Sequence, residues 1–320
     1  MSEDDSGDES EQDVPGTVFS DATREILSKV REFSNLERLV VEFDWDENQL
    51  ERAFYHFEKT EDHGQIEMIE REDAWRALMA KTYAAIGTNQ GVSKIKSLEM
   101  KDVLAKVPSS WGSGGFKAFL GSIEEFKISI RGMDNGAGWC LNTCDGYWIF
   151  MSKIGPNLTD HLKTVERLSI AANSDGPIGC EGHNHIASSL MVDSMPKLKH
   201  LHLRYFFLDP PLLRFIEAHL DVLESIKLEN SYAAGVHGLA ENGYPWTKFF
   251  NQIAAKNPMK LKTLTIIPEA VQLPWDVPEL WNEDKEKANS AKALLESGSR
   301  AFSYGHLVRI SIRLESFEVS

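Results

Sequence analysis

Residues 198–203 read Leu198-Lys199-His200-Leu201-His202-Leu203, which places leucine at the first, fourth and sixth positions of a six-residue phrase. Seven further phrases keep an apolar side chain at the same three positions, and they begin at Leu36, Ile95, Ile123, Val165, Leu223, Leu261 and Leu307. The second half of each phrase alternates between apolar and mostly polar side chains, which is the pattern of a strand with one buried face. Each phrase therefore predicts one β-strand.

The recurrence of this phrase predicts a repeat architecture. The pattern L-x-x-L-x-L is typical of leucine-rich repeats, in which each unit supplies one strand and a helix or loop that returns to the next strand. Successive phrases are 59, 28, 42, 33, 25, 38 and 46 residues apart, whereas a regular array keeps a period of about 20–29 residues. The sequence thus predicts an α/β solenoid of irregular leucine-rich repeats, with parallel strands on the concave side and helices and loops on the convex side.

The segments between the phrases predict the helices and loops of the repeats. We assign residues 17–320 to the leucine-rich-repeat domain, and residues 1–16 to a disordered acidic tail because they contain no Lys or Arg. Apolar side chains three or four residues apart predict helices over 23–33, 48–59, 71–86, 148–154, 211–220, 246–255 and 285–295. Glycine-rich stretches at 112–115, 132–138 and 173–182 predict loops.

Composition limits the class of partner. The 320 residues carry a formal net charge of −15, which argues against nucleic acid or an anionic membrane as a partner, since both need a basic surface. Three cysteines are too few for a disulfide framework and favour a reducing compartment, cytoplasmic or nuclear. The acidic start of the chain does not resemble a secretory signal, and no apolar run reaches the length of a membrane span.

One group of residues has the composition of a metal site. It consists of Cys140, Cys144, Cys180, His183 and His185. The two histidines are separated by one residue, so they would point in opposite directions on a strand. The spacing therefore favours loop residues that hold no metal, and we predict no cofactor. The glycine-rich stretch 111–117 lacks the G-x4-G-K-[ST] order of a phosphate-binding loop, and we predict a flexible turn there.

The polar positions of the strands are the candidate binding residues. Side chains alternate along a strand, so the residue between the last two apolar positions of each phrase faces away from the core. These residues form a predicted column of Val40, Glu99, Lys127, Ser169, His202, Lys227, Thr265 and Ser311. Six basic side chains gather around its middle: His200, His202, Arg204, Lys227, Lys127 and Arg167. We predict that they contact an acidic segment of a partner protein; the alternative is a solvated polar face balanced by Glu229 and Glu99.

Residues 195–203, Met195-Pro196-Lys197-Leu198-Lys199-His200-Leu201-His202-Leu203, carry a family resemblance together with 212–215, 223–228 and 246–253. They resemble the C-terminal region of filamentous-fungal F-box proteins with irregular leucine-rich repeats. The phrase at 33–39 is similar to the inter-repeat connections of that family, and the resemblance covers most of residues 20–320. It implies non-catalytic protein–protein recognition, in which the repeats act as the substrate receptor of a ubiquitin ligase.

The F-box itself is not visible in the sequence. Val14-Pro15 is followed by one predicted helix and then by the first strand phrase, which leaves no room for a three-helix box. The sequence is either a truncated version of a longer chain or a family member without the adaptor-binding end. We expect an unknown protein substrate on the concave face, and an adaptor of a cullin ligase only if an F-box lies upstream. Two other interpretations are a stand-alone scaffold without a link to ubiquitin and an enzyme with a site in the glycine-rich loops.

Overall fold

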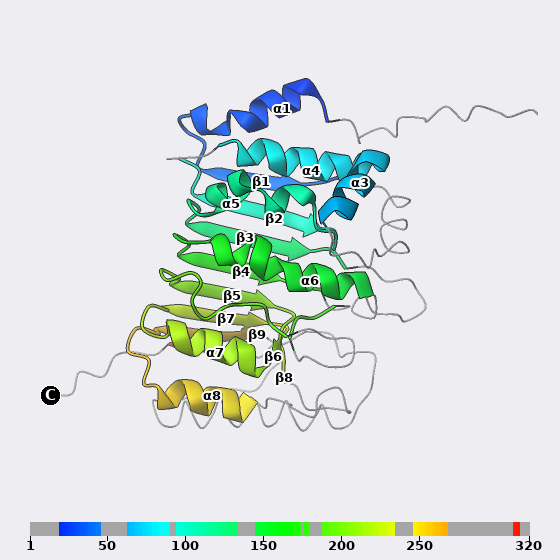
Figure 1. The fold of residues 1–320 in the computed structure, drawn as a ribbon. Helices are drawn as coiled ribbons and strands as arrows, with labels where there is room; N and C mark the ends of the chain where they lie inside the picture. The colour runs from blue at the N-terminus through cyan, green and yellow to red at the C-terminus, as the bar shows by residue number, and fades with distance from the viewer. Residues whose placement is uncertain are drawn as a thin grey trace, which may run out of the picture.

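A computed structural model describes residues 19–45, 63–89, 94–132, 145–173, 176–179, 187–233, 246–267 and 310–313. Several predicted segments lie outside these residues: the acidic tail and the helices at 48–59 and 285–295. The predicted loop at 132–138 also lies outside them, except for Gly132. The described residues form a mixed α/β fold around one eight-stranded sheet with strand order β1-β2-β3-β4-β5-β7-β9-β10 (Figure 1). The strands therefore follow one another across the sheet in the order of the sequence.

Each of the eight phrases contributes one strand of the sheet. The strands are β1 (Arg38–Glu42), β2 (Ser97–Val103), β3 (Glu125–Ile130), β4 (Arg167–Ala171), β5 (His200–Arg204), β7 (Ser225–Glu229), β9 (Thr263–Ile267) and β10 (Ile310–Arg313). The first seven pair in parallel, as predicted. The prediction is wrong for β10, which pairs antiparallel to β9 with Ile310 opposite Ile266. Alternation of side chains is the same in both strand directions, so the sequence pattern could not distinguish them.

Seven α-helices are described in these ranges: α1 (Asp21–Ser28), α3 (His63–Glu72), α4 (Ala74–Gly87), α5 (Gly114–Leu120), α6 (Asp145–Asn157), α7 (Pro210–His219) and α8 (Trp246–Ala255). Figure 1 shows α4, α5, α6 and α7 on one face of the sheet. Helix α7 begins at two prolines, and the Asp209 carboxylate accepts the Leu212 N–H at 2.8 Å. A side-chain acceptor before the first turn satisfies a helical N–H that lacks a backbone partner.

The glycine-rich stretch at 112–115 is not the flexible turn that the sequence predicted. A 3₁₀ turn over Ser109–Gly112 leads directly into α5. The Ser113 hydroxyl accepts the Phe116 N–H at 3.2 Å, and Phe116 and Phe119 are at most 1% exposed. This cap and the burial of the phenylalanines outweigh the low helix propensity of glycine.

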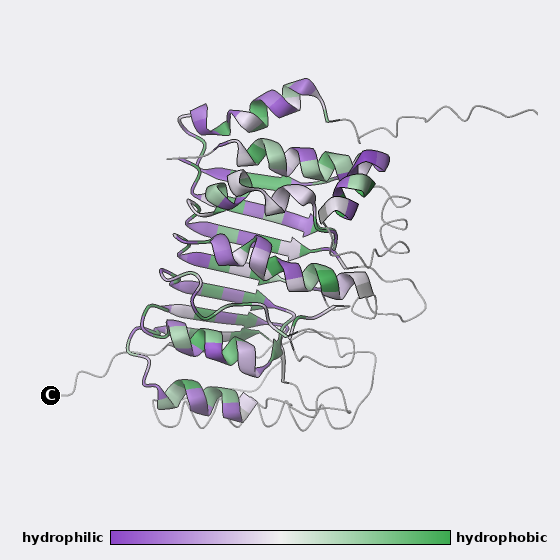
Figure 2. Ribbon diagram, in the orientation of Figure 1, coloured by the Kyte–Doolittle hydropathy of each residue, from purple (hydrophilic) through white to green (hydrophobic). Residues whose placement is uncertain are grey.

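The apolar positions of the strands point toward the helices and form the core. On β5, Leu201 and Leu203 are 1% and 0% exposed, whereas the side chains between them are only half-buried. A single cluster of buried side chains extends along the sheet from Val30 to Ile266. Figure 2 shows the resulting alternation of hydrophobic and hydrophilic residues along the strands.

The opposite side of the sheet, which we call the polar face, carries the predicted column in register. Neighbouring Cα pairs are Val40–Glu99, Glu99–Lys127, Lys127–Ser169, Ser169–His202, His202–Lys227, Lys227–Thr265 and Thr265–Ser311. The sequence prediction of this column is confirmed. Residues two positions before and after each member form flanking columns on the same face.

Candidate functional site

The six predicted binding residues come together on the polar face. His200, His202 and Arg204 lie on β5, and the other three lie on the strands β3, β4 and β7 (Lys127, Arg167 and Lys227). Arg167 is opposite His200, and His202 is opposite Lys227. Because adjacent strands are about 4.8 Å apart, the four strands hold these side chains in one patch, which we call the basic cluster.

Glu229 on β7 binds three members of the basic cluster. Its carboxylate accepts hydrogen bonds from Lys227 Nζ at 2.6 Å and from His202 Nε2 at 3.1 Å, and lies 3.6 Å from Arg204 Nε. Partial burial acts to raise the pKa of Glu229, but the bonds from Lys227 and His202 hold the pKa below its ordinary value. Glu229 is therefore ionised near neutral pH, in the balancing role that the sequence suggested for it.

Glu125 on β3 forms ion pairs with two further members of the basic cluster, Lys127 and Arg167. Lys127 Nζ is 2.9 Å and Arg167 Nε is 3.7 Å from Glu125 Oε1. Burial opposes ionisation, yet the Lys127 bond leaves the pKa of Glu125 below its ordinary value. The sequence reasoning named Glu99 for this role, but Glu99 pairs with Arg38. The register places Glu125 opposite Arg167 but also Glu99 opposite Lys127, so it does not decide between the two glutamates.

His202 is held between two neighbouring strands. Ser169 Oγ on β4 lies 3.2 Å from His202 Nδ1, and Glu229 on β7 lies 3.1 Å from Nε2. An ionised carboxylate only accepts hydrogen bonds, so we assign Nε2 as the donor to Glu229 and Nδ1 as the acceptor of the Ser169 hydroxyl. Burial first, and then the charge of Lys227, lower the pKa of His202. The ring is therefore neutral at neutral pH.

Ser169, His202 and Glu229 stand in the order of a hydrolase triad, but their surroundings favour another role. In a triad the carboxylate orients the imidazole and stabilises the imidazolium that forms during acyl transfer. Here Glu229 also binds Lys227 at 2.6 Å, and the Lys227 charge lowers the pKa of His202. Both effects oppose proton uptake by the ring. The arrangement therefore fixes the position of the imidazole and does not favour activation of Ser169.

The polar face carries more positive than negative side chains. In the aligned columns from β1 to β9 there are six Lys and Arg residues, namely Arg38, Lys101, Lys127, Arg167, Arg204 and Lys227. The same columns contain four glutamates, namely Glu42, Glu99, Glu125 and Glu229. The whole chain has a net charge of −15. The polar face is thus a locally cationic surface on an acidic protein.

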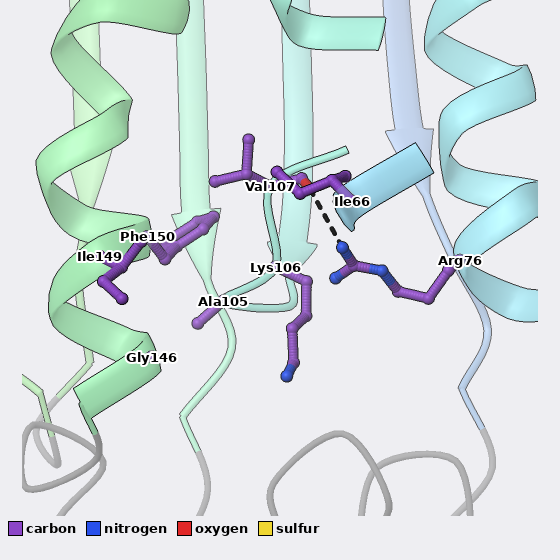
Figure 3. A pocket seen from close by; sticks show the side chains of 8 residues that line it. All are labelled: Ile66, Arg76, Ala105, Lys106, Val107, Gly146, Ile149 and Phe150. Atoms are coloured by element: carbon purple, nitrogen blue, oxygen red, sulfur yellow. Dashed lines mark hydrogen bonds between the residues drawn. The ribbon is translucent and has the colours of Figure 1, made fainter. Parts of the chain in front are cut away.

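A small cavity on the helix side of the sheet brings together two buried basic side chains, Arg76 and Lys106 (Figure 3). It is lined in part by Ile66, Arg76, Lys106 and Phe150, and its volume is about 20 Å³. Arg76 is 2% exposed and donates to the Val107 carbonyl at 3.2 Å. A cavity of this size holds about one water molecule, so it is too small for a substrate.

The remaining sequence candidates receive no structural test. Cys140, Cys144, Cys180, His183 and His185 lie outside the residues that the structure describes. Within the described ranges, no group of three His, Cys, Asp or Glu side chains is placed to bind a metal ion. No helix in those ranges combines the length and the apolar character needed to cross a membrane.

Comparisons of the chain with protein-family models, with curated proteins and with solved structures found no match. The functional interpretation therefore depends on the geometry and charge of the polar face.

Proposed function

We propose that this protein is a non-catalytic recognition module whose polar face captures an acidic segment of a partner protein. The observation that carries the proposal is the basic cluster, in which four adjacent strands present His200, His202, Arg204, Lys227, Lys127 and Arg167 on an acidic chain. The sequence order of the strands also supports the interpretation of the fold as an irregular leucine-rich-repeat solenoid. In such a solenoid the polar face is the concave binding surface.

The side chains of the basic cluster are positioned before a partner binds. Glu229 and Glu125 fix five of the six side chains through hydrogen bonds or ion pairs, and the sixth, His200, lies 2.9 Å from Ser225 Oγ. A partner carboxylate then meets ordered donors and loses less side-chain entropy on binding. Exposed ion pairs contribute only about 0.2–1 kcal/mol each. Useful affinity thus requires several acidic residues in the partner, and binding weakens as salt increases.

The resemblance to fungal F-box proteins extends this proposal to a cellular role. A substrate receptor of a ubiquitin ligase positions a target protein and contributes no catalytic group, which fits a binding face of this kind. A stand-alone scaffold would use the same face without an adaptor. Mixing a cullin-ligase adaptor with the chain, extended by any upstream coding sequence, and following co-elution by size-exclusion chromatography separates the two roles.

Fluorescence anisotropy with a labelled peptide of alternating glutamate and serine tests the binding proposal. We expect the triple variant His202→Ala/Arg204→Ala/Lys227→Ala to bind about tenfold more weakly, since the charged contacts of Arg204 and Lys227, each worth up to about 1 kcal/mol, are lost. The matched control is Arg38→Ala/Lys101→Ala, which removes the same number of Lys and Arg charges from the far end of the polar face. Equal weakening in both variants would show that only bulk charge matters, and no weakening in the triple variant would remove the proposal.

A further inference from the structure

A hollow at the edge of the sheet where β5, β7 and β9 begin lies beside the basic cluster and shares none of its residues. Its volume is about 680 Å³, and it is lined by Glu166, Pro196, Lys197, Lys199, Val222, Glu224, Lys260 and Lys262. Four of them lie one position before a strand: Glu166, Lys199, Glu224 and Lys262. Three lie three positions before a strand, namely Lys197, Val222 and Lys260, and Pro196 is next to Lys197. We call this place the lysine hollow. It contains four lysines and two glutamates, so its lining is cationic on a chain of net charge −15.

Backbone hydrogen bonds make the lysine hollow a regular surface. The Glu166 carbonyl accepts the N–H groups of Lys199 and His200, both at 2.9 Å. The Lys199 carbonyl accepts two N–H groups from the next strand start, and the Glu224 carbonyl accepts two from the one after that, at 2.7–3.2 Å. This ladder continues the sheet beyond the strands. Residues at equivalent positions are therefore held about 4.8 Å apart.

Side chains one position before the strands neutralise one another. Lys199 Nζ lies 2.9 Å from Glu166, and Lys262 Nζ lies 2.8 Å from Glu224. The hydrogen bond from Lys199 is the main reason that the pKa of Glu166 is lowered, and the charge of Lys197 adds to it. After these two pairs have formed, two lysines of the lysine hollow, Lys197 and Lys260, remain as its net positive charge.

Two side chains three positions before a strand, Lys197 and Lys260, supply the excess charge. Val222 occupies the equivalent position before the strand between them. Lys197 and Lys260 are exposed and form no hydrogen bond or ion pair with the residues that the structure describes. The strands that they precede, β5 and β9, are two spacings apart, which is about 10 Å, and the half-buried Val222 precedes the strand between them.

We propose that the lysine hollow binds an extended acidic segment of a partner protein, with two carboxylates about 10 Å apart on one side of the segment. A polyproline II segment satisfies this spacing, because residues i and i+3 lie on one side and about 9 Å apart. Each carboxylate meets one of the two exposed lysines, Lys197 and Lys260, and the chain between the carboxylates passes over Val222. The surface differs from the polar face, so the two sites can engage separate segments.

Binding of a fluorescein-labelled peptide of four Glu-Pro-Pro repeats tests this inference by fluorescence anisotropy. A peptide of the same composition, with all glutamates in one block, controls for total charge. The variant Lys197→Ala/Lys260→Ala removes the two lysines, and Lys81→Ala/Lys94→Ala removes two exposed lysines elsewhere. We expect the spaced peptide to bind about tenfold more weakly to the first variant, because two cation–carboxylate contacts are lost, and to bind the second variant as it binds the wild type.

The polar-face triple variant distinguishes this site from the one proposed above. It should retain wild-type affinity for the spaced peptide if the lysine hollow is the binding site. Loss of binding in that variant, or wild-type binding to Lys197→Ala/Lys260→Ala, would overturn the inference. Equal affinity for the block peptide would overturn the spacing argument. Tighter binding of an oligouridylate than of the spaced peptide would also overturn it, because the ligand would then be a nucleic acid.

Discussion

Two substitutions beside His202 should move its pKa in opposite directions. Glu229→Gln keeps the size of the side chain but removes the charge that favours the imidazolium. Lys227→Met keeps most of the aliphatic stem but removes a charge that disfavours it. The hydrogen bond and charge of Glu229 raise the pKa of His202, whereas burial and the charge of Lys227 lower it. We therefore expect a lower pKa in Glu229→Gln and a higher pKa in Lys227→Met.

Distances give the relative size of the two effects. Glu229 Oε2 is 3.1 Å from His202 Nε2 and 2.6 Å from Lys227 Nζ, so the ring and the ammonium are within about 6 Å of each other. With the screening of bulk water, a charge at the shorter distance contributes about 1.3 kcal/mol, and one at no more than about 6 Å contributes at least about 0.7 kcal/mol. The charge of Lys227 and the hydrogen bond and charge of Glu229 therefore act on the pKa of His202 with comparable strength and in opposite directions.

The assay is an NMR titration of protein labelled at its histidine rings. The same protonation also couples to stability. Since the pKa of His202 is lower in the folded state, the unfolded state binds the proton first, and stability falls as pH drops below about 6.5. Lys227→Met should reduce this loss, and Glu229→Gln should extend it to lower pH. Shifts of the same sign in both variants, or none in either, would refute the arrangement of charges around His202.

Three further predictions concern the fold. Leu201→Ala should lower the free energy of unfolding by about 3–5 kcal/mol in urea denaturation, because Leu201 is 1% exposed in the core; a loss below about 1 kcal/mol would contradict its inward orientation. Asp209→Ala should cost about 2 kcal/mol by the same assay, since the carboxylate accepts N–H groups from Leu212 and Ser188 and is 2% exposed; a neutral effect would exclude the cap. Gly87→Ala should lower the thermal midpoint, because a Cβ there would lie 2.8 Å from Phe116 N where α4 meets α5; an unchanged or raised midpoint would contradict that close approach.

The strands were predictable because their pattern is local and repeated. Every L-x-x-L-x-L phrase supplies a strand of the sheet, and the alternation within a phrase determines which side chains share the polar face. The direction of β10 was not predictable, since alternation has no polarity. The short strands β6 (Phe207–Leu208) and β8 (Tyr232–Ala233), which pair with each other, are too short to show a period. Helix α5 was missed because two glycines outweighed Phe116 and Phe119 in the sequence reasoning.

The sequence predicted which basic residues lie near one another at the candidate site, but not which glutamate each of them pairs with. Register alone brings His202 beside Lys227 and Arg167 beside His200. The choice between Glu99 and Glu125 as the partner of Lys127 and Arg167 depends on how long side chains orient across strands. Sequence spacing carries no information on that orientation. The lysine hollow was also missed, because the residues before each strand lie outside the repeated phrase positions that the sequence reasoning assigned to the polar face.

The most direct test of the account is to observe which histidines respond to the acidic peptide. The chain has ten histidines, and His200→Gln and His202→Gln assign the two that belong to the basic cluster. His219, which is 3% exposed in α7 on the helix side of the sheet, serves as an internal control. We predict that the alternating glutamate–serine peptide shifts the ring signals of His200 and His202 and leaves His219 unchanged. A response at His219 without one at His200 and His202 would contradict binding at the polar face, as would the absence of any response at saturating peptide.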